Sequence, residues 1–312
     1  AIIFFPLDLP FVAESLVQRV RPGVFMPVET ELWPNFLRAI RELHIPVMMV
    51  NGRISEKSVK NYRYLYGIWE DMLNTVTRFC MQSTIDADYI TSLGADKAKV
   101  FVTGNTKFDQ TYAEVTAEDL EKYRTELSIS DAYPVIVAGS THPGEEQILI
   151  DSFKAIRAQF NNARLLIAPR KIARADEIAK IAHNAGFETG YRSKMLEDVK
   201  TRKDYPVVLL DTIGELGRIY AVGDVVFVGG SFSNTGGHNV LEPAAHAKPI
   251  LVGPNMQNFK DSYSLLSKVK ACKMVNNQAE LTEEILDILS NEERRKQMGS
   301  ASLQVIMSAL MR

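Results

Sequence analysis

Long hydrophobic runs are missing from this sequence of 312 residues. No run of roughly 18 apolar residues occurs, so we predict no transmembrane helix within these residues. Basic charge is not in excess either, because 36 lysines and arginines stand against 38 aspartates and glutamates and the net charge is −2. Electrostatic binding of nucleic acid needs a positive surface, so we expect no nucleic-acid partner.

Cysteine and histidine are also scarce. The two cysteines, Cys80 and Cys272, lie far apart in apolar stretches, a pattern typical of buried free thiols in a reducing compartment. The five histidines lack the spacing that a metal site needs, so we expect no metal site. No signal-peptide pattern is visible.

The first residues look like a strand without its neighbours. The stretch Ala1-Ile2-Ile3-Phe4-Phe5-Pro6 predicts a buried strand that is entered without a methionine. A strand of a parallel sheet is buried on both faces and needs neighbours. We therefore expect the natural protein to have residues before Ala1.

Short apolar runs rich in β-branched residues alternate with amphipathic stretches along the whole chain. Runs that are apolar on both faces are typical of a parallel sheet with helices on both sides. The stretches Glu31–Leu43, Glu145–Phe160 and Leu281–Met311 predict helices. The alternation indicates βαβ units and an α/β fold. The predicted strands are Ile2–Phe5, Val24–Val28, Val47–Asn51, Phe79–Gln82, Val100–Thr103, Val135–Ala138, Leu165–Ala168, Val207–Leu210, Val225–Val228 and Ile250–Val252.

A polar segment separates two halves of this pattern. Residues Asp109–Pro134 are rich in glutamate and aspartate and fit a linker that enters a solvated helix. We place the domain boundary there, which gives an N-terminal domain of residues 1–115 and a C-terminal domain of residues 116–312.

The strongest chemical signal is the glycine-rich stretch after the strand Val225–Val228. Gly229-Gly230 ends that strand, and Gly236-Gly237 precede an expected helix. Such glycines let backbone N–H groups approach an anion, and a helix N-terminus adds partial positive charge. Ligands of open α/β sheets bind at the carboxyl ends of strands, so we expect a phosphate site here.

Glu242 lies one turn into the expected helix, three residues after Asn239. A carboxylate there is a poor phosphate ligand but can accept hydrogen bonds from two vicinal ribose hydroxyls. The alternative is that the glycines only form a tight turn and that Glu242 caps the helix. Four glycines combined with Asn239 and Glu242 favour the functional interpretation.

Two further strand ends carry polar residues. Ser140 and Thr141 follow the strand Val135–Ala138 and can cap the next helix, contact substrate, or do both. Arg170 follows the strand Leu165–Ala168, where a guanidinium can grip a phosphate or a base oxygen with two hydrogen bonds.

The segment Asp211–Leu216 also follows a predicted strand and opens a helix. Gly214 permits a close approach of the backbone, whose amide and carbonyl groups can bind a base edge. Capping of the helix by Asp211 or Thr212 is the alternative interpretation.

In the N-terminal half, Glu29 and Glu31 lie two residues apart where a strand ends. They can act as a helix-capping device, or as a catalytic pair or its support. Lys107 follows another strand just before the domain boundary, which places it near the interdomain cleft. A lysine there can neutralise charge on a departing phosphate.

Together these segments resemble the 3-deoxy-D-manno-octulosonic acid (Kdo) transferase family of lipopolysaccharide synthesis. The resemblance runs nearly end to end, and the motifs occur in the family order. They are Glu29-Thr30-Glu31-Leu32-Trp33-Pro34-Asn35, Gly139-Ser140-Thr141-His142 with Gly144-Glu145-Glu146, and Gly236-Gly237-His238-Asn239 with Leu241-Glu242. The resemblance implies a GT-B-type fold, in which two Rossmann-like domains with parallel sheets face a cleft.

The resemblance also implies an inverting glycosyltransferase that moves Kdo from CMP-Kdo to a lipid A precursor, lipid IVA, without a metal or other cofactor. It implies a peripheral protein on the cytoplasmic face of the bacterial inner membrane. Glu29 and Lys107 match family residues that stabilise the transition state. The implied nucleotide contacts are Pro169, Arg170, Ile213, Gly214, Glu215, Asn239, Val240, Leu241 and Glu242, with Ser140, Thr141, Gly236 and Gly237 as further donor contacts.

One departure from the family lies upstream. Family members carry a membrane-associating segment and a catalytic base before the stretch that matches Ile2–Phe5, so we expect this chain to lack both, and its N-terminal domain to be incomplete. Two other functions stay open. One is a UDP-sugar epimerase-like enzyme on the same scaffold, which selective binding of CMP over UDP would exclude. The other is a catalytically incomplete CMP-binding fragment.

Overall fold

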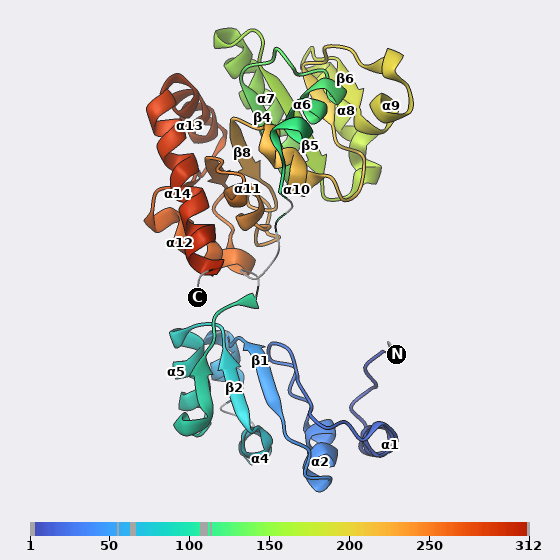
Figure 1. Ribbon diagram of the computed structural model, residues 1–312, viewed down its shortest axis with the longest axis vertical. Helices are drawn as coiled ribbons and strands as arrows, with labels where there is room; N and C mark the ends of the chain where they lie inside the picture. The colour runs from blue at the N-terminus through green and yellow to red at the C-terminus, as the bar shows by residue number, and fades with distance from the viewer. Residues whose placement is uncertain (1–3, 55, 63–66, 107–111, 113, 311–312) are drawn as a thin grey trace. The chain divides into compact units, whose positions relative to one another are not determined.

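The computed structural model describes residues 4–54, 56–62, 67–106, 112 and 114–310. The chain forms two compact units, unit 1 from Ala1 to Gln110 and unit 2 from Thr111 to Arg312 (Figure 1). The sequence placed this boundary between residues 115 and 116, inside the same polar segment. Each unit has a hydrophobic core of its own.

Unit 1 contains a parallel sheet of three strands, β1 (Met48–Gly52), β2 (Arg78–Met81) and β3 (Val100–Val102), in the order β1-β2-β3. Its helices are α1 (Pro10–Val20), α2 (Pro34–Glu42), α3 (Glu56–Tyr62), α4 (Ile68–Thr75) and α5 (Thr84–Ser92), with the short 3₁₀ helix η1 (Lys97–Lys99) before β3. Buried side chains of α2, α4 and α5 pack on β1 and β2 to form the core.

The segment Val24–Val28, predicted as a strand, forms only two parallel bridges to the β1 region, Phe25 with Val47 and Val28 with Val50. Pro27 gives the reason. Its carbonyl accepts a hydrogen bond from Val50 N, but proline has no N–H to return to the neighbouring strand. The ladder is therefore interrupted, and the segment lies beside β1 as an irregular edge.

The strand predicted over Ile2–Phe5 is wrong for its described residues, since Phe4 and Phe5 lie in no strand; Ile2 and Ile3 lie outside the described residues. Phe4 is fully exposed, and the Phe5 ring packs on Trp33 and Phe36 of the α2 region. Apolar character alone predicted the strand. The Phe5 ring is held by aromatic contacts, with no hydrogen-bonded ladder.

Unit 2 is built on a parallel sheet of seven strands in the order β10-β9-β8-β4-β5-β7-β6. The strands are β4 (Val135–Thr141), β5 (Arg164–Pro169), β6 (Thr189–Tyr191), β7 (Val207–Leu209), β8 (Val225–Val228), β9 (Ile250–Val252) and β10 (Cys272–Met274). The larger helices are α6 (Ala117–Glu126), α7 (Glu145–Gln159), α8 (Ala175–Asn184), α12 (Lys260–Lys268), α13 (Gln278–Ser290) and α14 (Glu292–Leu310). Shorter helices are α9 (Arg192–Glu197), α10 (Leu216–Ile219) and α11 (Leu241–Ala245).

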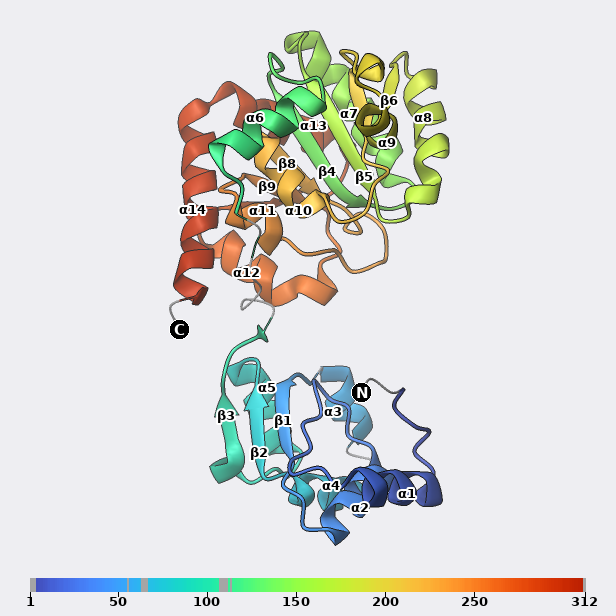
Figure 2. The same cartoon turned by 45° about the vertical axis from the view of Figure 1, so that its right-hand side comes forward.

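Both faces of this sheet are buried, as the apolar strand sequences predicted. Ile136, Leu165 and Phe227 belong to the core formed with α7, α8 and α13. Their chain neighbours Val137 and Val226 point to the opposite face and are also fully buried. Figure 2 shows helices on both sides of the sheet. None of the helices in the described ranges is both long and apolar enough to cross a bilayer.

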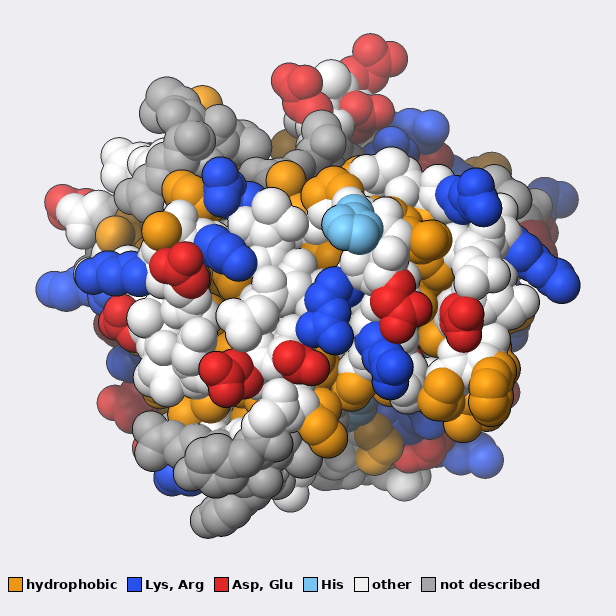
Figure 3. Space-filling model, turned by 90° about the horizontal axis from the view of Figure 1, so that it is seen from below, with side chains coloured by type: hydrophobic (Ala, Val, Ile, Leu, Met, Phe, Trp, Pro, Cys, Tyr) orange, Lys and Arg blue, Asp and Glu red, His pale blue; other side chains and the backbone are white. Residues whose placement is uncertain are grey.

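The surface carries mixed charge. On the face seen in Figure 3, lysine and arginine side chains lie among aspartate and glutamate side chains, with hydrophobic side chains between them. The described residues on this face therefore present no extended patch of one sign, in keeping with the balanced composition.

Candidate functional site

The site is built around the place where the direction of strand addition reverses. The strand β4 pairs with β5 on one side and with β8 on the other, so the chain runs outward from β4 in both directions. Such a switch point leaves a crevice at the carboxyl ends of the two central strands. Gly229 N–H donates to Gly139 O at 2.8 Å and holds those two ends together.

The end of β4 is tightly constrained. A Cβ on Gly139 would lie 1.9 Å from the Tyr220 hydroxyl oxygen, so only glycine fits there. Ser140 follows in the left-handed region, with φ of 56°, where β4 bulges against β5. A non-glycine residue in that region costs about 1–3 kcal/mol, and such strain clusters at functional sites.

The interpretation of Ser140 and Thr141 as helix caps is wrong. The α7 helix begins after Gly144, and no side chain caps it. Thr141 Oγ1 donates instead to Glu146 Oε1 at 2.9 Å, and the Glu146 carboxylate is paired with Arg174 at 2.6 Å. Thr141 is therefore fixed by a buried ion pair, while Ser140 is half-buried at the crevice.

The first glycine pair does not offer its amides to a ligand. The carboxylate of Glu145 accepts hydrogen bonds from the backbone N–H groups of Gly230, Ser231 and Phe232 at 2.8 to 2.9 Å, and from His142 N–H at 2.9 Å. The glycine loop after β8 does hold an anion, as its composition suggested. That anion is a side chain of the protein itself.

Two histidines, one from each central loop, face each other across the switch point. His142 Nε2 and His238 Nε2 lie 2.8 Å apart, and the two rings are stacked. Burial, with the charges of His142 and Arg170 adding to it, lowers the pKa of His238 to about 4. One ring must then donate the shared proton and the other accept it.

Sequence reasoning missed this pair because it tested the histidines only for metal spacing. A better signal was available, since each histidine directly follows a strand-end or glycine motif. Histidines in two loops at the ends of neighbouring strands are brought together by the sheet.

Pro169 is the last residue of β5, where it lies beside Thr141. The next residue, Arg170, donates its backbone N–H to Thr141 O at 3.0 Å, which fixes where its side chain begins. That side chain is exposed, and its charge is close enough to influence His238. The Arg170 cation thus lies within electrostatic range of His238.

Asn239 and Glu242 are joined as a unit. Asn239 Oδ1 accepts from Leu241 N–H at 3.0 Å, and its Nδ2 donates to Glu242 Oε1 at 3.2 Å. The capping interpretation of Glu242 is wrong, because α11 starts after Val240 without a side-chain cap. Val240 and Leu241 are fully buried in this structure.

Residues of α9 fix the loop Asp211–Glu215, which follows β7. The capping interpretation of Asp211 is wrong, since its carboxylate accepts from Ser193 N–H at 2.8 Å and Ser193 Oγ at 2.6 Å. Thr212 is likewise no cap, because its hydroxyl donates to Glu215 Oε2 at 2.5 Å. Ile213, between Thr212 and Glu215, is 85% exposed. It lies at a turn that Gly214 completes with a φ of 89°.

Glu215 is paired with Arg192 at 2.9 Å, and Arg192 also bonds Glu126 of α6 at 2.7 Å. The Arg192 side chain is only 1% exposed. The Glu215 carboxylate is thus engaged within the protein, which leaves its backbone as the part able to meet a ligand. The helix α10, which follows this loop, contacts the end of α11, since His246 Nε2 lies 2.6 Å from Gly217 O.

The second glycine pair is explained by the fold itself. Gly236 and Gly237 have φ of 93° and 79°, and a Cβ on either would overlap Asn258 or Met256. Gly237 N–H donates to Gly230 O at 2.8 Å. These glycines therefore shape the loop that leads from Gly230 to Asn239.

In unit 1, Glu29 has a φ of 60° and an exposed side chain, with its N–H bonded to Val50 O at 2.9 Å. The capping interpretation of Glu29 and Glu31 is wrong, because the Asp8 carboxylate accepts from the first amides of α2. Glu31 accepts instead from Trp33 Nε1 at 2.9 Å.

Lys107 lies outside the described residues. The residue before it, Thr106, donates its N–H to Asn51 Oδ1 at 3.1 Å.

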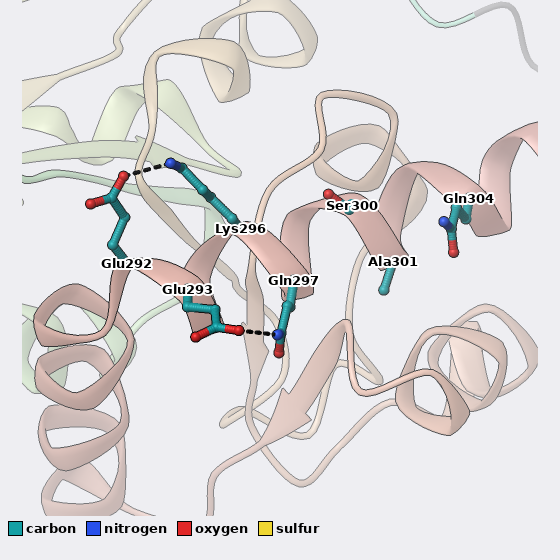
Figure 4. Close-up of a pocket in the computed structure, with 7 residues that line it drawn as sticks. All are labelled: Glu292, Glu293, Lys296, Gln297, Ser300, Ala301 and Gln304. Atoms are coloured by element: carbon teal, nitrogen blue, oxygen red, sulfur yellow. Dashed lines mark hydrogen bonds and ion pairs between the residues drawn. The ribbon is translucent and has the colours of Figure 1, made fainter.

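Two surface hollows are lined by residues other than those that the sequence assigned to the nucleotide. Figure 4 shows an open hollow on α14, crossed by the Lys296–Glu292 ion pair and the Gln297–Glu293 hydrogen bond. A second, in unit 1, is lined mainly by apolar residues and by Glu31. Among the described residues, no three His, Cys, Asp or Glu side chains are grouped as a metal site requires.

Comparison with known proteins assigns the family. Residues 1–110 match the family model described as 3-deoxy-D-manno-octulosonic-acid transferase. The 3-deoxy-D-manno-octulosonic acid transferase of Haemophilus influenzae is 32% identical over 305 residues, which cover 97% of this chain and 70% of that protein. The chain belongs to the Kdo transferase family. It is thus a member of a glycosyltransferase family, as its motifs indicated.

Solved structures similar to this Kdo transferase family member agree on the fold. The C-terminal CMP-Kdo binding domain of WaaA from Acinetobacter baumannii is 27% identical, with a TM-score of 0.55, and the match covers 61% of this chain and 96% of that domain. UDP-GlcNAc 2-epimerase from Neisseria meningitidis, at 13% identity, has a TM-score of 0.59 over 96% of this chain and 78% of that one, and shows the fold alone. The α/β, GT-B-type fold is confirmed.

Proposed function

We propose that this chain serves in the transfer of Kdo from CMP-Kdo to a lipid A precursor, lipid IVA, in lipopolysaccharide core synthesis at the cytoplasmic face of the inner membrane. Unit 2 binds the CMP part of the donor. The proposal rests on the order of the strands, because the predicted nucleotide residues follow β5, β7 and β8 of one parallel sheet, and ligands of such sheets bind at the carboxyl ends of the strands. The likeness of unit 2 to a domain named for CMP-Kdo binding supports it.

The ribose is assigned to Glu242. Burial raises the pKa of the Glu242 carboxyl, whereas the Asn239 amide lowers it. A half-buried carboxylate is a strong acceptor for two vicinal hydroxyls and has few competing waters. A Cβ on Gly217 would lie 3.8 Å from Glu242 Oε2, so α10, which directly follows the loop Ile213–Glu215, adjoins this carboxylate. That loop is assigned to the base.

The phosphate is assigned to Arg170. Its guanidinium is exposed, lies within electrostatic range of His238, and offers paired donors to a phosphate. The partial charge of a helix N-terminus contributes less than the sequence suggested, because α11 has only five residues. Arg170, and not the helix, is then the main neutralising group in unit 2.

The reaction proposed is a direct displacement with inversion. A base removes the proton from an acceptor hydroxyl, and that oxygen forms a bond to the anomeric carbon of Kdo. The bond from this carbon to the phosphate oxygen breaks, and CMP leaves with the bonding electrons. Arg170 and Lys107 are assigned to the negative charge that moves to the phosphate, Glu29 is assigned to the transition state on the family resemblance alone, and no metal is required.

Calorimetric titration of the whole chain tests the nucleotide assignment. We expect CMP to bind, UMP and UDP to bind at least tenfold more weakly, and Arg170→Ala to weaken CMP. A folded chain that shows no heat with CMP contradicts the proposal. Preference for UDP would favour the epimerase-like alternative.

A further inference from the structure

We infer that Glu145 is a built-in anion that fixes the loop after β8 in the shape the donor site needs. The inference rests on the proposed function of that site. Glu145 is 1% exposed and lies in the first turn of α7. Its two carboxylate oxygens accept four backbone N–H groups, Oε1 from Ser231 and Phe232, and Oε2 from His142 and Gly230.

The geometry is that of an anion-binding nest occupied from inside. Successive backbone N–H groups that converge on one point form a concavity that attracts an anion. A buried carboxylate is costly unless it is hydrogen-bonded, and four donors compensate for its loss of water. Gly229 makes the approach possible, because a Cβ there would lie 2.8 Å from Glu145 Oε2.

The four donors come from both central loops. His142 follows β4, whereas the other three follow β8, so the carboxylate ties the two strand ends together across the switch point. Ser231 is anchored a second time, since its hydroxyl donates to Val228 O and accepts from Gly253 N–H. The loop is thus held from α7, β8 and β9 at once.

The position of Gly230 determines where His238 and the segment leading to Asn239 and Glu242 lie. A Cβ on Gly230 would lie 2.8 Å from His238 Cδ2, so the His238 ring rests directly on this residue. Gly230 O also accepts the hydrogen bond from Gly237 N–H, and Gly237 leads to Asn239 and Glu242. Glu145 touches none of the atoms assigned to the ligand. It acts through the loop, as a positioning residue.

The next residue provides a matched control. Glu146 is as buried as Glu145 and lies in the same first turn. Its carboxylate bonds Thr141 Oγ1 and Arg174, and within the described part of the chain it bonds none of the glycine-loop amides. Loss of either carboxylate should lower stability, but only loss of Glu145 empties the nest.

The test is chemical rescue of Glu145→Ala by formate, with Glu146→Ala and the unchanged chain beside it. We expect Glu145→Ala to bind CMP at least tenfold more weakly, and formate to restore at least half of that factor with saturation. Formate should also raise the Tm of Glu145→Ala without nucleotide, and leave the other two proteins unchanged. The Tm readout needs no CMP, so it tests the nest even if the donor assignment fails.

Two results would overturn the inference. One is a folded Glu145→Ala that binds CMP as the unchanged chain does. The other is a loss that formate leaves untouched in both readouts. If the alanine variant does not fold, Glu145→Gln decides, because its amide keeps one acceptor oxygen. It should weaken CMP at least threefold, and unchanged affinity would overturn the inference equally.

Discussion

Single residues decide the chemistry that we assign to this site, and the role of Glu242 can be tested most directly. Its carboxylate is half-buried and is held by Asn239. We expect Glu242→Gln to weaken CMP by about 1–3 kcal/mol, because the ribose hydroxyls lose a charged acceptor. Calorimetry with CMP and with its 2′,3′-dideoxy form measures this. An equal loss for both ligands would remove Glu242 from the ribose.

His238 should make stability depend on pH in an unusual window. Its pKa falls from 6.5 to about 4 on folding. Between these values the unfolded chain binds a proton that the folded chain does not, so stability is lost as pH falls from about 6.5 toward 4. The facing groups are His142 and Arg170, neither of which supplies a compensating negative charge.

We therefore expect His238→Gln to lose less unfolding free energy than the unchanged chain between pH 7.5 and pH 5. Urea unfolding at both pH values measures the difference. His246, whose pKa is also lowered by burial, contributes equally to both proteins and cancels. Identical slopes would show that His238 keeps an ordinary pKa.

At the scale of elements, α9 supports the loop assigned to the base. Arg192 joins Glu126 of α6 to Glu215 of that loop, and its Nη1 is buried without a partner among the described residues. Removing one partner of a buried pair leaves the others uncompensated. We expect Arg192→Leu to cost about 3 kcal/mol in urea unfolding. The triple variant with Glu126→Gln and Glu215→Gln should recover part of that loss, and no recovery would argue against the ion pairs.

Strands that are apolar throughout could be predicted from the sequence, and edge strands of mixed composition could not. The strands β4, β5, β7, β8 and β9 coincide with predicted runs. The strands β6 and β10 were missed because each lies at an edge of the sheet and includes a glycine or a lysine, whereas β7 and β9, equally short, are wholly apolar. Such strands form because a neighbour offers its edge, which is a tertiary effect that periodicity does not contain.

The sequence predicted which loops carry the candidate site, but it did not predict the hydrogen-bond partners of the side chains in those loops. Strand-end motifs indicated the loops, because parallel strands bring their ends to one edge. Nothing local could show that Glu145 bonds Gly230, 85 residues later, or that Asp211 bonds Ser193. Capping was the role that the sequence suggested for these acidic and hydroxyl residues. Asp211 instead bonds Ser193, whereas Thr141 and Thr212 bond glutamate side chains a few residues away.

At the scale of the whole molecule, a destabilising substitution in the core of one unit should leave the binding properties of the other unit unchanged. Leu73 is buried in the core of unit 1, and the proposed nucleotide residues all belong to unit 2. We expect Leu73→Ala to lower the stability of unit 1 by about 2–5 kcal/mol and to leave CMP affinity unchanged. Unfolding followed by circular dichroism, with calorimetry of CMP binding, checks both parts. A tenfold drop in CMP affinity would show that unit 1 shapes the nucleotide site.

The reversal of strand order in unit 2 also governs when the site can exist during folding. The pairing of β4 with β8 is sealed by Val135 N–H bonded to Asp224 Oδ2, across 89 residues of chain. Closing so long a loop is slow, and its entropy must be lost before the contact forms. The crevice is therefore completed only after most of the sheet has been made. CMP would then hold the finished unit closed and slow its unfolding, while leaving the speed of folding as it was.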